Sequence, residues 1–383
     1  MKIFFYYLQD LDIDRGTPLR ARNIIKFLSK KHEAVVVAEK LSSPELLSRV
    51  KFYPIKKYSY PKGLNFFYKV RDLKRIIKAT KPDILYGFTC NSLFSLGLIA
   101  KQLKIPLVIE MHEAGHKGLD PNVIWRSLLG FFEKKALKQV SGLVAVSSKI
   151  KDYYLALAKN PNLPAQVIYG GVDIDLFNLT APLAPEIQAI KKQGKMIIGY
   201  IGSFKDYQGV DFILASALEN CQDFLYIMVG GDSQRLRDRI AQGGLQDKVF
   251  LFGKKKYETI PGFLRGMDIM VIPRASLPIT EYAFPSKLSE YMAMGKAVVI
   301  TDVGGSKEVI KDKENGILIP ADNIVQNLIN SFDLLKANPE LKNKIEKNAL
   351  NFVRDNLTWQ KQTEKLNTFL QWILKTPQKI KQF

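Results

Sequence analysis

The sequence predicts an α/β protein made of two Rossmann-like, doubly wound domains that face each other across a cleft. Apolar strand-like runs alternate with amphipathic helical patterns from one end of the chain to the other, which is typical of parallel sheets covered by helices. The chain has 383 residues, enough for two domains of about 180 residues each. The alternation is interrupted once, near the middle, by the proline-containing stretch Thr180–Pro185, which we interpret as a linker.

The elements follow in order along each half. In residues 1–178, the first predicted domain, we expect strands at Ile3–Leu8, Ala34–Ala38, Ile84–Phe88, Leu107–Met111 and Leu143–Val146, and helices at Leu19–Lys30, Phe66–Ala79 and Asn91–Leu103. In residues 179–357, the second, we expect strands at Met196–Ile201, Phe224–Val229, Val249–Phe252, Ile269–Ile272 and Ala297–Ile300, and helices at Asp211–Glu219, Gln234–Gln242 and Ile260–Arg265. A last amphipathic stretch covers Thr358–Lys375.

Composition narrows the class of protein. Hydrophobic residues make up 46% of the chain and charged residues 25%, as in ordinary globular proteins. The two cysteines lie far apart without a CxxC spacing, which argues against a zinc site or a disulfide framework and fits a reducing compartment. The amino-terminal apolar run is too short for a signal peptide, so we expect a cytoplasmic protein. The uncharged run Ile84–Ala100 carries polar residues, so a strand followed by a helix is a better interpretation than a membrane span.

The stretch Phe284–Gly305 is the most informative part of the sequence. It predicts a helix with Pro285 at its first position, an apolar face that contains Leu288, and Gly295 as the left-handed stop. Lys287 then lies in the first turn, where the helix macrodipole is positive, and Glu290 points away from the core. The residues alone also fit a surface helix with a solvated lysine and glutamate.

This stretch resembles the donor-site signature of the retaining glycosyltransferases of family 4, which have the two-domain GT-B fold and use nucleotide sugars. The pattern P-S-K-L-x-E-Y-M-A-x-G-K-x-V-V is present from Pro285 onward. Two further segments, Ser141–Ser148 and Val167–Phe177, resemble the family's A-D-x-V-I-A-V-S and V-I-P-N-G-V-D-x-x-x-F segments. The resemblance implies that Glu290 binds the ribose hydroxyls, that Ser286 belongs to the donor site, and that the helix beginning near residue 358 crosses back onto the first domain, which would include residues 358–383.

A glycine-rich loop, Gly199–Gly209, lies between a predicted strand and a predicted helix. Backbone N–H groups in such a loop can bind a pyrophosphate, although a plain turn has the same composition. The donor-binding residues that we assign to this loop are Gly202, Ser203, Lys205, Gln208 and Gly209.

The loop also departs from the family pattern. Ser203 fits the family pattern, in which arginine or serine is usual at this position. Gln208, however, stands where the family has its diphosphate-binding lysine. We therefore expect the positive charge that stabilises the leaving phosphate to come from Lys287 in the first place and from Lys205 in the second. Loss of activity is the third explanation.

The string His112-Glu113-Ala114-Gly115-His116 has two interpretations. On a helix, H-E-x-x-H would bind zinc, with Glu113 as general base. The string follows directly on an apolar strand and contains a glycine, which is unfavourable inside a helix. We therefore expect no helix and no metal site here. The family resemblance matches His112 to the histidine that approaches the transferred sugar and gives no role to His116. An uninvolved loop histidine is the alternative.

Two further regions are candidates for donor contacts. Many family members have two glutamates eight positions apart, but Glu281 lies nine residues before Glu290, so its contact with sugar hydroxyls is an expectation weighed against an ordinary loop carboxylate. Near the amino terminus, Gly16 matches the family's glycine loop, and Arg15 or Arg20 could reach a phosphate.

The net charge of +20 is concentrated in the first domain, since residues 1–178 contribute +14 of it. Aromatic and basic side chains alternate in Lys51–Lys62 and Phe66–Arg75, a composition suited to anionic lipid. Such composition also suits nucleic acid, but the sequence contains no motif of a nucleic-acid-binding module. We therefore expect no nucleic acid as a partner. A solvated surface is the alternative to a membrane contact.

These features predict a glycosyltransferase of hexosyltransferase type that moves a sugar from a nucleotide diphosphate to a hydroxyl of a glycan or lipid-linked glycan, as in polysaccharide biosynthesis. We expect retention of configuration, no metal or other cofactor, and a peripheral position at the inner face of the membrane. The alternatives are a sugar-nucleotide epimerase on the same fold and an inactive basic relative that binds lipid or nucleic acid. The base, the sugar, the acceptor and the oligomeric state do not follow from the sequence.

Overall fold

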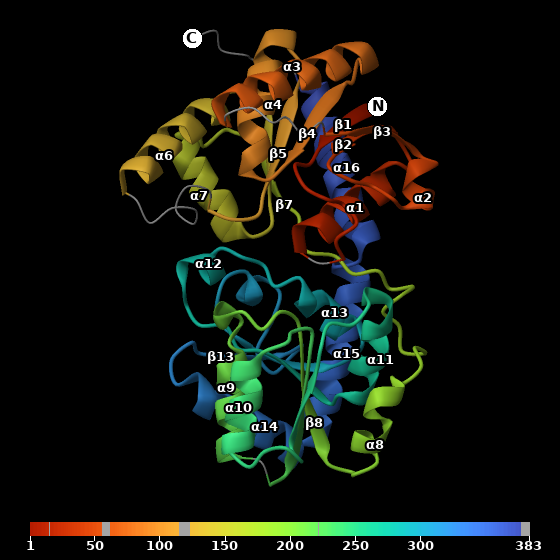
Figure 1. The fold of residues 1–383 in the computed structure, drawn as a ribbon, viewed down its shortest axis with the longest axis vertical. Helices are drawn as coiled ribbons and strands as arrows, with labels where there is room; N and C mark the ends of the chain where they lie inside the picture. Colours follow the sequence, from red (N-terminus) through yellow and green to blue (C-terminus); the bar gives the residue numbers. More distant parts are fainter. Residues whose placement is uncertain (15, 56–61, 115–122, 221, 377–383) are drawn as a thin grey trace. The chain divides into compact units, whose positions relative to one another are not determined.

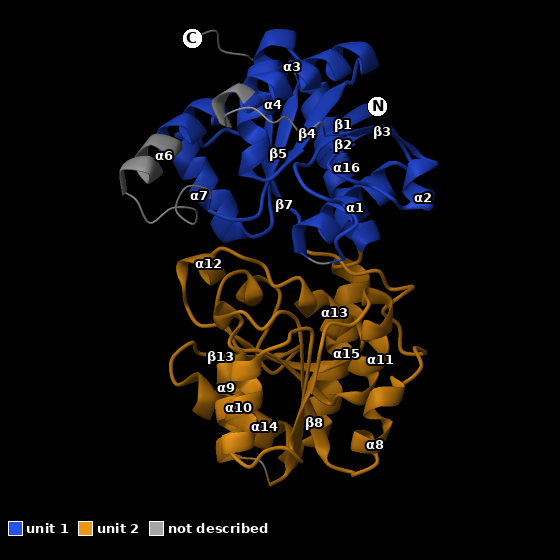
Figure 2. Cartoon of the chain, in the orientation of Figure 1, with its two compact units in different colours: residues 1–169, 359–383 blue, residues 170–358 orange. Residues whose placement is uncertain are grey.

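The computed structural model describes residues 1–14, 16–55, 62–114, 123–220 and 222–376 (Figure 1). The chain forms two compact units: unit 1 comprises residues 1–169 and 359–383, and unit 2 comprises residues 170–358 (Figure 2). The sequence placed these divisions at 178/179 and 357/358. Residues 170–178 belong to unit 2 because Val172 bridges to Thr358 and the ring of Phe177 lies 5.3 Å from that of Tyr257.

Unit 1 contains a seven-stranded parallel sheet in the order β3-β2-β1-β4-β5-β6-β7. Its strands are β1 (Lys2–Tyr6), β2 (Glu33–Ala38), β3 (Val50–Pro54), β4 (Ile84–Phe88), β5 (Leu107–Met111), β6 (Gly142–Ala145) and β7 (Ala165–Val167). Its helices are α1 (Gly16–Leu28), α2 (Pro44–Leu47), α3 (Lys62–Thr80), α4 (Cys90–Leu103), α6 (Val123–Leu137), α7 (Ser148–Ala158) and α16 (Trp359–Lys375).

Both faces of this sheet are covered by helices. Helices α1 and α16 pack together on one face, where Ile24, Leu366 and Phe369 share a core with Tyr86 of β4. Helix α4 lies on the other face, because a Cβ atom at Gly87 would meet side chains of α4. The near-continuous burial of the strands follows from this two-sided cover.

Unit 2 contains a six-stranded parallel sheet in the order β10-β9-β8-β11-β12-β13. Its strands are β8 (Met196–Ile201), β9 (Phe224–Val229), β10 (Val249–Phe252), β11 (Ile269–Ile272), β12 (Ala297–Thr301) and β13 (Ile317–Ile319). Its α-helices are α8 (Gln188–Lys191), α9 (Val210–Glu219), α10 (Gln234–Gln242), α11 (Ile260–Gly266), α12 (Pro278–Glu281), α13 (Lys287–Ala293), α14 (Ile324–Ala337) and α15 (Pro339–Asn356), joined by 3₁₀ turns that include η2 (Asp206–Gln208) and η3 (Tyr257–Thr259).

The prediction of two parallel, helix-covered sheets is confirmed, with three differences in detail. Several elements of these sheets and layers were not predicted from the sequence, among them β3, β7, β13, α6, α7, α14 and α15. The stretch that we interpreted as a linker lies inside unit 2, where Ala184 donates a backbone hydrogen bond to Gly262 of α11. Helix α13 has only seven residues and begins at Lys287, so Pro285 precedes it by two positions rather than occupying its first turn.

Candidate active site

The candidate site in unit 2 lies where the strand order of the sheet reverses. Strand β8 pairs with β9 on one side and with β11 on the other, so the chain turns in opposite directions from β8. In open parallel sheets, ligands bind beyond the carboxyl ends of the strands at such a reversal. The loop after β8 contains Gly202, and the loop after β11 contains Arg274.

Two glycines of the loop after β8 are required by its geometry. Gly202 has a φ of 152°, and a Cβ atom there would lie 2.3 Å from the Nζ atom of Lys287. Gly209 has a φ of 76°, and its Cβ atom would lie 1.8 Å from the carbonyl oxygen of Pro273. Side chains at these positions would collide with the lysine and with the loop after β11. The two glycines therefore let the three segments approach closely.

The side chain of Lys287 extends to Gln208, the position at which the family pattern has a lysine. Its Nζ atom donates hydrogen bonds to the hydroxyl of Tyr200 at 2.9 Å and to Oε1 of Gln208 at 3.1 Å. It also lies 4.1 Å from the centre of the Tyr200 ring. Burial lowers the pKa of Lys287 well below its ordinary value, and the neighbouring charge of Arg274 acts in the same direction. Within the described ranges, Lys287 forms no ion pair with a carboxylate.

Arg274 is a candidate site residue that was not predicted from the sequence. The residue is 9% exposed, and its Nε atom has no hydrogen-bond partner in the described structure. This burial lowers the pKa of Arg274, because a poorly solvated guanidinium is less stable in its charged form. A buried cationic donor without a partner is costly unless a ligand supplies one. The sequence signal that could have found it is a cation two residues after an uninterrupted apolar strand, at the carboxyl edge of the sheet.

Glu290 lies near Lys287, whose charge acts on its pKa. Its Oε1 atom accepts a hydrogen bond of 2.9 Å from the hydroxyl of Tyr257, at η3. Burial raises the pKa of Glu290 to about 7, opposed by the Tyr257 hydrogen bond and by the charge of Lys287. The side chain is half-buried while its neighbours Leu288 and Tyr291 are fully buried, as expected from its place off the apolar face.

The remaining predicted residues of unit 2 have less distinctive surroundings. Lys205 is exposed and lies 5.8 Å from the Tyr207 ring centre. The carbonyl oxygen of Ser203 accepts a hydrogen bond from Tyr200. Glu281 lies in α12, where it accepts a hydrogen bond of 2.7 Å from Ser276. Ser286 is exposed and caps α13 without a side-chain hydrogen bond.

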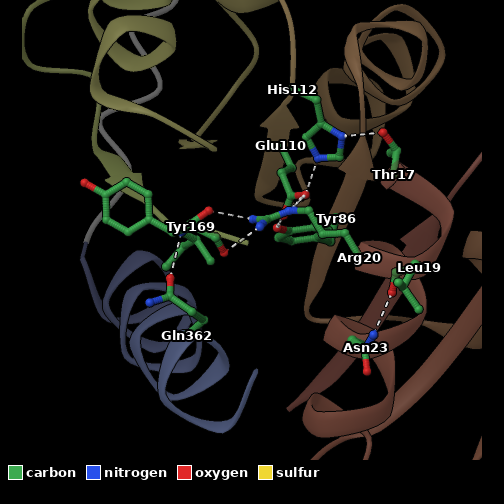
Figure 3. Close-up of polar contacts among 10 residues, drawn as sticks. Thr17, Leu19, Arg20, Asn23, Tyr86, Glu110, His112, Tyr169 and Gln362 are labelled. Carbon is green, nitrogen blue, oxygen red and sulfur yellow. Dashed lines mark hydrogen bonds and ion pairs between the residues drawn. The ribbon is translucent and has the colours of Figure 1, made fainter. Parts of the chain in front are cut away.

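In unit 1, His112 directly follows β5 and is held by two side chains (Figure 3). Its Nε2 atom contacts Oε1 of Glu110, and its Nδ1 atom lies 3.1 Å from the hydroxyl of Thr17 in α1. Glu110 is fully buried and also accepts hydrogen bonds from Tyr86 and, at 2.8 Å, from Nε of Arg20. Although burial raises the pKa of Glu110, the charges and hydrogen bonds of Arg20 and His112 outweigh it and lower this pKa to about 2.

Arg20 is committed to the interior of unit 1 and does not provide the phosphate contact that we considered. Its Nη1 and Nη2 atoms donate to the carbonyl oxygens of Tyr169 and Ile168 at 2.7 and 2.8 Å (Figure 3). Its guanidinium lies 5.8 Å from the Trp359 ring centre. Gly16 is exposed at a φ of 56°, with no atom within 4 Å of a Cβ placed there. Arg15 lies outside the described residues.

The described part of the H-E-x-x-H string is not helical. Residues 112–114 follow β5 as irregular backbone, whereas Gly115 and His116 lie outside the described residues. In the ranges that the structure covers, no group of three or more histidine, cysteine or acidic side chains is placed to hold a metal ion. No helix among the described residues has both the length and the apolar character needed to cross a bilayer.

Comparison with protein families gives two matches that together span most of the chain. Residues 15–176 match the family described as Glycosyltransferase Family 4. Residues 185–352 match the family described as Glycosyl transferases group 1.

Individual relatives have low sequence identity to this chain but align with most of its length. A glycosyltransferase of Methanocaldococcus jannaschii, itself uncharacterized, is 26% identical over 293 residues, which are 75% of each chain. The phosphatidyl-myo-inositol mannosyltransferase of Mycobacterium tuberculosis strain H37Rv is 27% identical over 259 residues, or 66% of this chain and 63% of the relative.

Solved structures share the fold over nearly the whole chain. A glycosyltransferase from Rickettsia africae aligns with a TM-score of 0.78 at 20% identity and covers 98% of this chain and 99% of its own. HepE from Anabaena, in complex with UDP, aligns with a TM-score of 0.76 at 18% identity and covers 97% of this chain and 100% of its own.

Proposed function

The chain belongs to the family 4, group 1 glycosyltransferases with the GT-B fold, and we propose that unit 2 holds the nucleotide diphosphate of its sugar donor on Glu290, Lys287 and Arg274. The observation that carries this proposal is the excess of buried positive charge at the end of β8 and β11. Lys287 lies near Arg274, which has an unpartnered donor, and near the carboxylate of Glu290, whose pKa is raised to about 7. A diphosphate supplies the missing negative charge.

Each residue has a chemical role in this proposal. The Glu290 carboxylate accepts hydrogen bonds from the ribose hydroxyls, in place of the Tyr257 hydroxyl that it now binds. Backbone N–H groups of the loop at Gly202 contact the diphosphate. Arg274 and Lys287 bind its oxygens and stabilise the charge that develops as the sugar leaves, which is the interaction that accelerates such a step most. Ser203, Lys205, Gln208 and Ser286 complete the donor contacts, with Lys205 outermost.

On the family resemblance, His112 and Glu281 contact the transferred sugar, and Gly16 lies near the donor phosphate and the acceptor. On the same resemblance we propose transfer with retention of configuration and without a metal, in which Lys287 and Arg274 stabilise the charge of the leaving diphosphate. A hexose is the first sugar to test, since one relative is named a mannosyltransferase. UDP is the first nucleotide to test, since HepE is known in complex with it.

A lipid-linked acceptor at a membrane is the finer proposal for unit 1. Helix α4 packs beside α3 and α6, and these helices expose Phe67, Leu98 and Phe131 at 70%, 50% and 61%. Exposed basic residues flank them on the same helices: Arg71, Arg75, Lys78, Lys101 and Lys135. Apolar side chains among cations suit an anionic bilayer surface, at about 1 kcal/mol per well-placed basic residue. Of the segment Lys51–Lys62 that we singled out, residues 56–61 lie outside the described structure.

The relative named for phosphatidyl-myo-inositol supports this acceptor class. Sedimentation with vesicles distinguishes it from a solvated surface. Binding to phosphatidylglycerol vesicles, lost in Phe67→Ser and Phe131→Ser together and weakened by salt, supports the proposal. Equal recovery with neutral vesicles contradicts it.

A nucleotide panel tests the proposed function itself. Thermal shift with UDP, GDP and other nucleoside diphosphates identifies the base, because a ligand at 100 times its dissociation constant stabilises by roughly 2.7 kcal/mol. Acceptor-dependent release of the nucleotide from the matching sugar donor then separates a transferase from an epimerase. A protein that binds no nucleoside diphosphate is the inactive relative that the loss of lysine at position 208 also allows.

A further inference from the structure

Glu110 and His112 form a pair in which the position of the imidazole proton follows from the carboxylate. Glu110 is fully buried and accepts hydrogen bonds from Arg20, Tyr86 and His112, so it is surrounded by donors (Figure 3). An ionised carboxylate can only accept hydrogen bonds. The Nε2 atom of His112 must therefore carry a proton and donate it to Glu110.

The other ring nitrogen is then fixed as well. In an imidazole with a single proton, Nδ1 is an acceptor when Nε2 is the donor. Its partner at 3.1 Å is the hydroxyl of Thr17, which can donate. Thr17 is half-buried, and its neighbour Gly16 is exposed with open space where a side chain would lie. The Nδ1 edge of His112 is thus the one that lies toward solvent-accessible residues.

We infer that Glu110 is a positioning residue that fixes the Nε2–H tautomer of His112, so that Nδ1 and the Thr17 hydroxyl together recognise one hydroxyl group of the substrate. The ligand hydroxyl donates to Nδ1 and accepts from Thr17, replacing the direct contact between the two side chains. This inference rests on the proposed function for the identity of the ligand, a sugar, but not for the tautomer.

Arg20 makes the arrangement rigid. It neutralises Glu110 and at the same time binds the carbonyl oxygens of Ile168 and Tyr169, where the chain leaves unit 1. Gln362 of α16 accepts a hydrogen bond of 2.7 Å from the backbone N–H of Tyr169. Because α1, β5, the end of unit 1 and α16 all meet at this one guanidinium, Glu110 has little freedom to turn away from His112.

Nitrogen-15 NMR of the histidine rings tests the tautomer without any substrate. The chain has three histidines, so His112→Asn assigns the signal. At alkaline pH we expect wild-type His112 to be protonated on Nε2 only, and Glu110→Gln to give a mixture of tautomers. Tyr86→Phe is the matched control, since it removes a donor from the other oxygen of Glu110 and should keep the wild-type tautomer. A wild-type His112 ring protonated on Nδ1, or a mixture of tautomers, overturns the inference even if Glu110→Gln does not fold.

Kinetics test the recognition of a hydroxyl. Glu110→Gln and Thr17→Val should each lower kcat/KM for the sugar donor by about tenfold to 100-fold, as for one lost substrate hydrogen bond, with unchanged affinity for the nucleoside diphosphate. Tyr86→Phe should change kcat/KM by less than about threefold. Wild-type kcat/KM in both Glu110→Gln and Thr17→Val overturns the inference. A wild-type protein that binds no nucleoside diphosphate contradicts the proposed function instead, and leaves the NMR result to decide the tautomer.

Discussion

The buried polar group of unit 1 is complete, whereas that of unit 2 is not. Glu110 accepts from Arg20, Tyr86 and His112, and the charges and hydrogen bonds of Arg20 and His112 lower its pKa to about 2. In unit 2, Arg274 has an unpartnered Nε atom, and burial raises the pKa of Glu290 to about 7. Satisfied networks stabilise and position, while an unsatisfied buried cation indicates a ligand.

The difference separates two kinds of residue that look alike in sequence. Arg20 and Arg274 are both buried arginines near the carboxyl edge of a parallel sheet. Arg20 has four partners within unit 1, so it serves the protein itself. Arg274 has no carboxylate partner in the described structure, and its charge lowers the pKa of Lys287, which is consistent with the anion site that we propose.

The largest effect is expected from Glu290→Ala. It removes two hydrogen bonds to a charged acceptor, each worth about 1.5–3 kcal/mol, so nucleoside diphosphate affinity should fall by roughly 100-fold or more. Calorimetric titration measures this, with circular dichroism to show that the variant is folded. Glu281→Ala is the matched control, because a sugar contact leaves affinity for the free nucleotide unchanged. Wild-type affinity in Glu290→Ala would contradict the proposal that Glu290 of unit 2 binds the nucleotide.

The next effect is expected from Lys287→Ala. An interaction with the charge that develops on the leaving diphosphate acts on turnover, so kcat should fall by about 10²–10³ with a smaller change in donor KM. Lys205→Ala should do much less, because Lys205 is exposed on a loop. Equal small effects in steady-state kinetics would mean that backbone groups hold the phosphate, and a larger defect in Lys205→Ala would mean that the charge was assigned to the wrong residue.

A smaller effect concerns pH. Because Glu290 has a pKa of about 7 and binds the ribose as a carboxylate, nucleotide affinity should rise with pH below 7, by at most about tenfold per pH unit, and level off above it. The folded state also holds this proton more tightly than the unfolded state, so the stability contributed by Glu290 is lost as pH rises from 4.5 to 7.

Glu290→Gln should reduce both effects. Its affinity for the nucleotide should change with pH less than that of wild type, and its melting temperature relative to wild type should be higher at pH 8 than at pH 5. A wild-type affinity that does not change between pH 5.5 and 8 would contradict the raised pKa of Glu290.

The smallest effect is expected from a chelator, which should leave activity intact. His112 is bound to Glu110 and Thr17 and follows a strand rather than lying on a helix. Elemental analysis of the purified protein is the complementary measurement. One zinc ion per chain, lost together with activity, would restore the zinc interpretation of the H-E-x-x-H string.

Local patterns predicted the fold class and the family, but not the partners of buried charges. Glycine spacing and the P-S-K-L signature placed Gly202, Lys287 and Glu290 on elements that the structure brings together. Glu110 was read as part of an apolar strand because its counter-ion, Arg20, lies 90 residues away. Such pairings depend on the order of strands in the sheet, which a single sequence does not specify.

Arg274 shows the same limit in unit 2. It follows the apolar strand β11, and its nearness to Lys287 depends on β11 lying next to β8. The start of helix α13 also differs from the prediction. The sequence predicts a helix that begins at Pro285, but Ser286 caps α13, so the helix is shorter than predicted.

The most direct test of the incomplete charge in unit 2 is the affinity of Arg274→Met for nucleoside mono- and diphosphates. By titration, wild type should bind the diphosphate more tightly than the monophosphate, and Arg274→Met should lose about tenfold or more of the diphosphate affinity while monophosphate affinity changes little. Arg235→Gln, an exposed arginine paired with Asp211 in the same unit, should behave as wild type. Undiminished diphosphate affinity in Arg274→Met, or a wild type that does not distinguish the two nucleotides, would contradict the account.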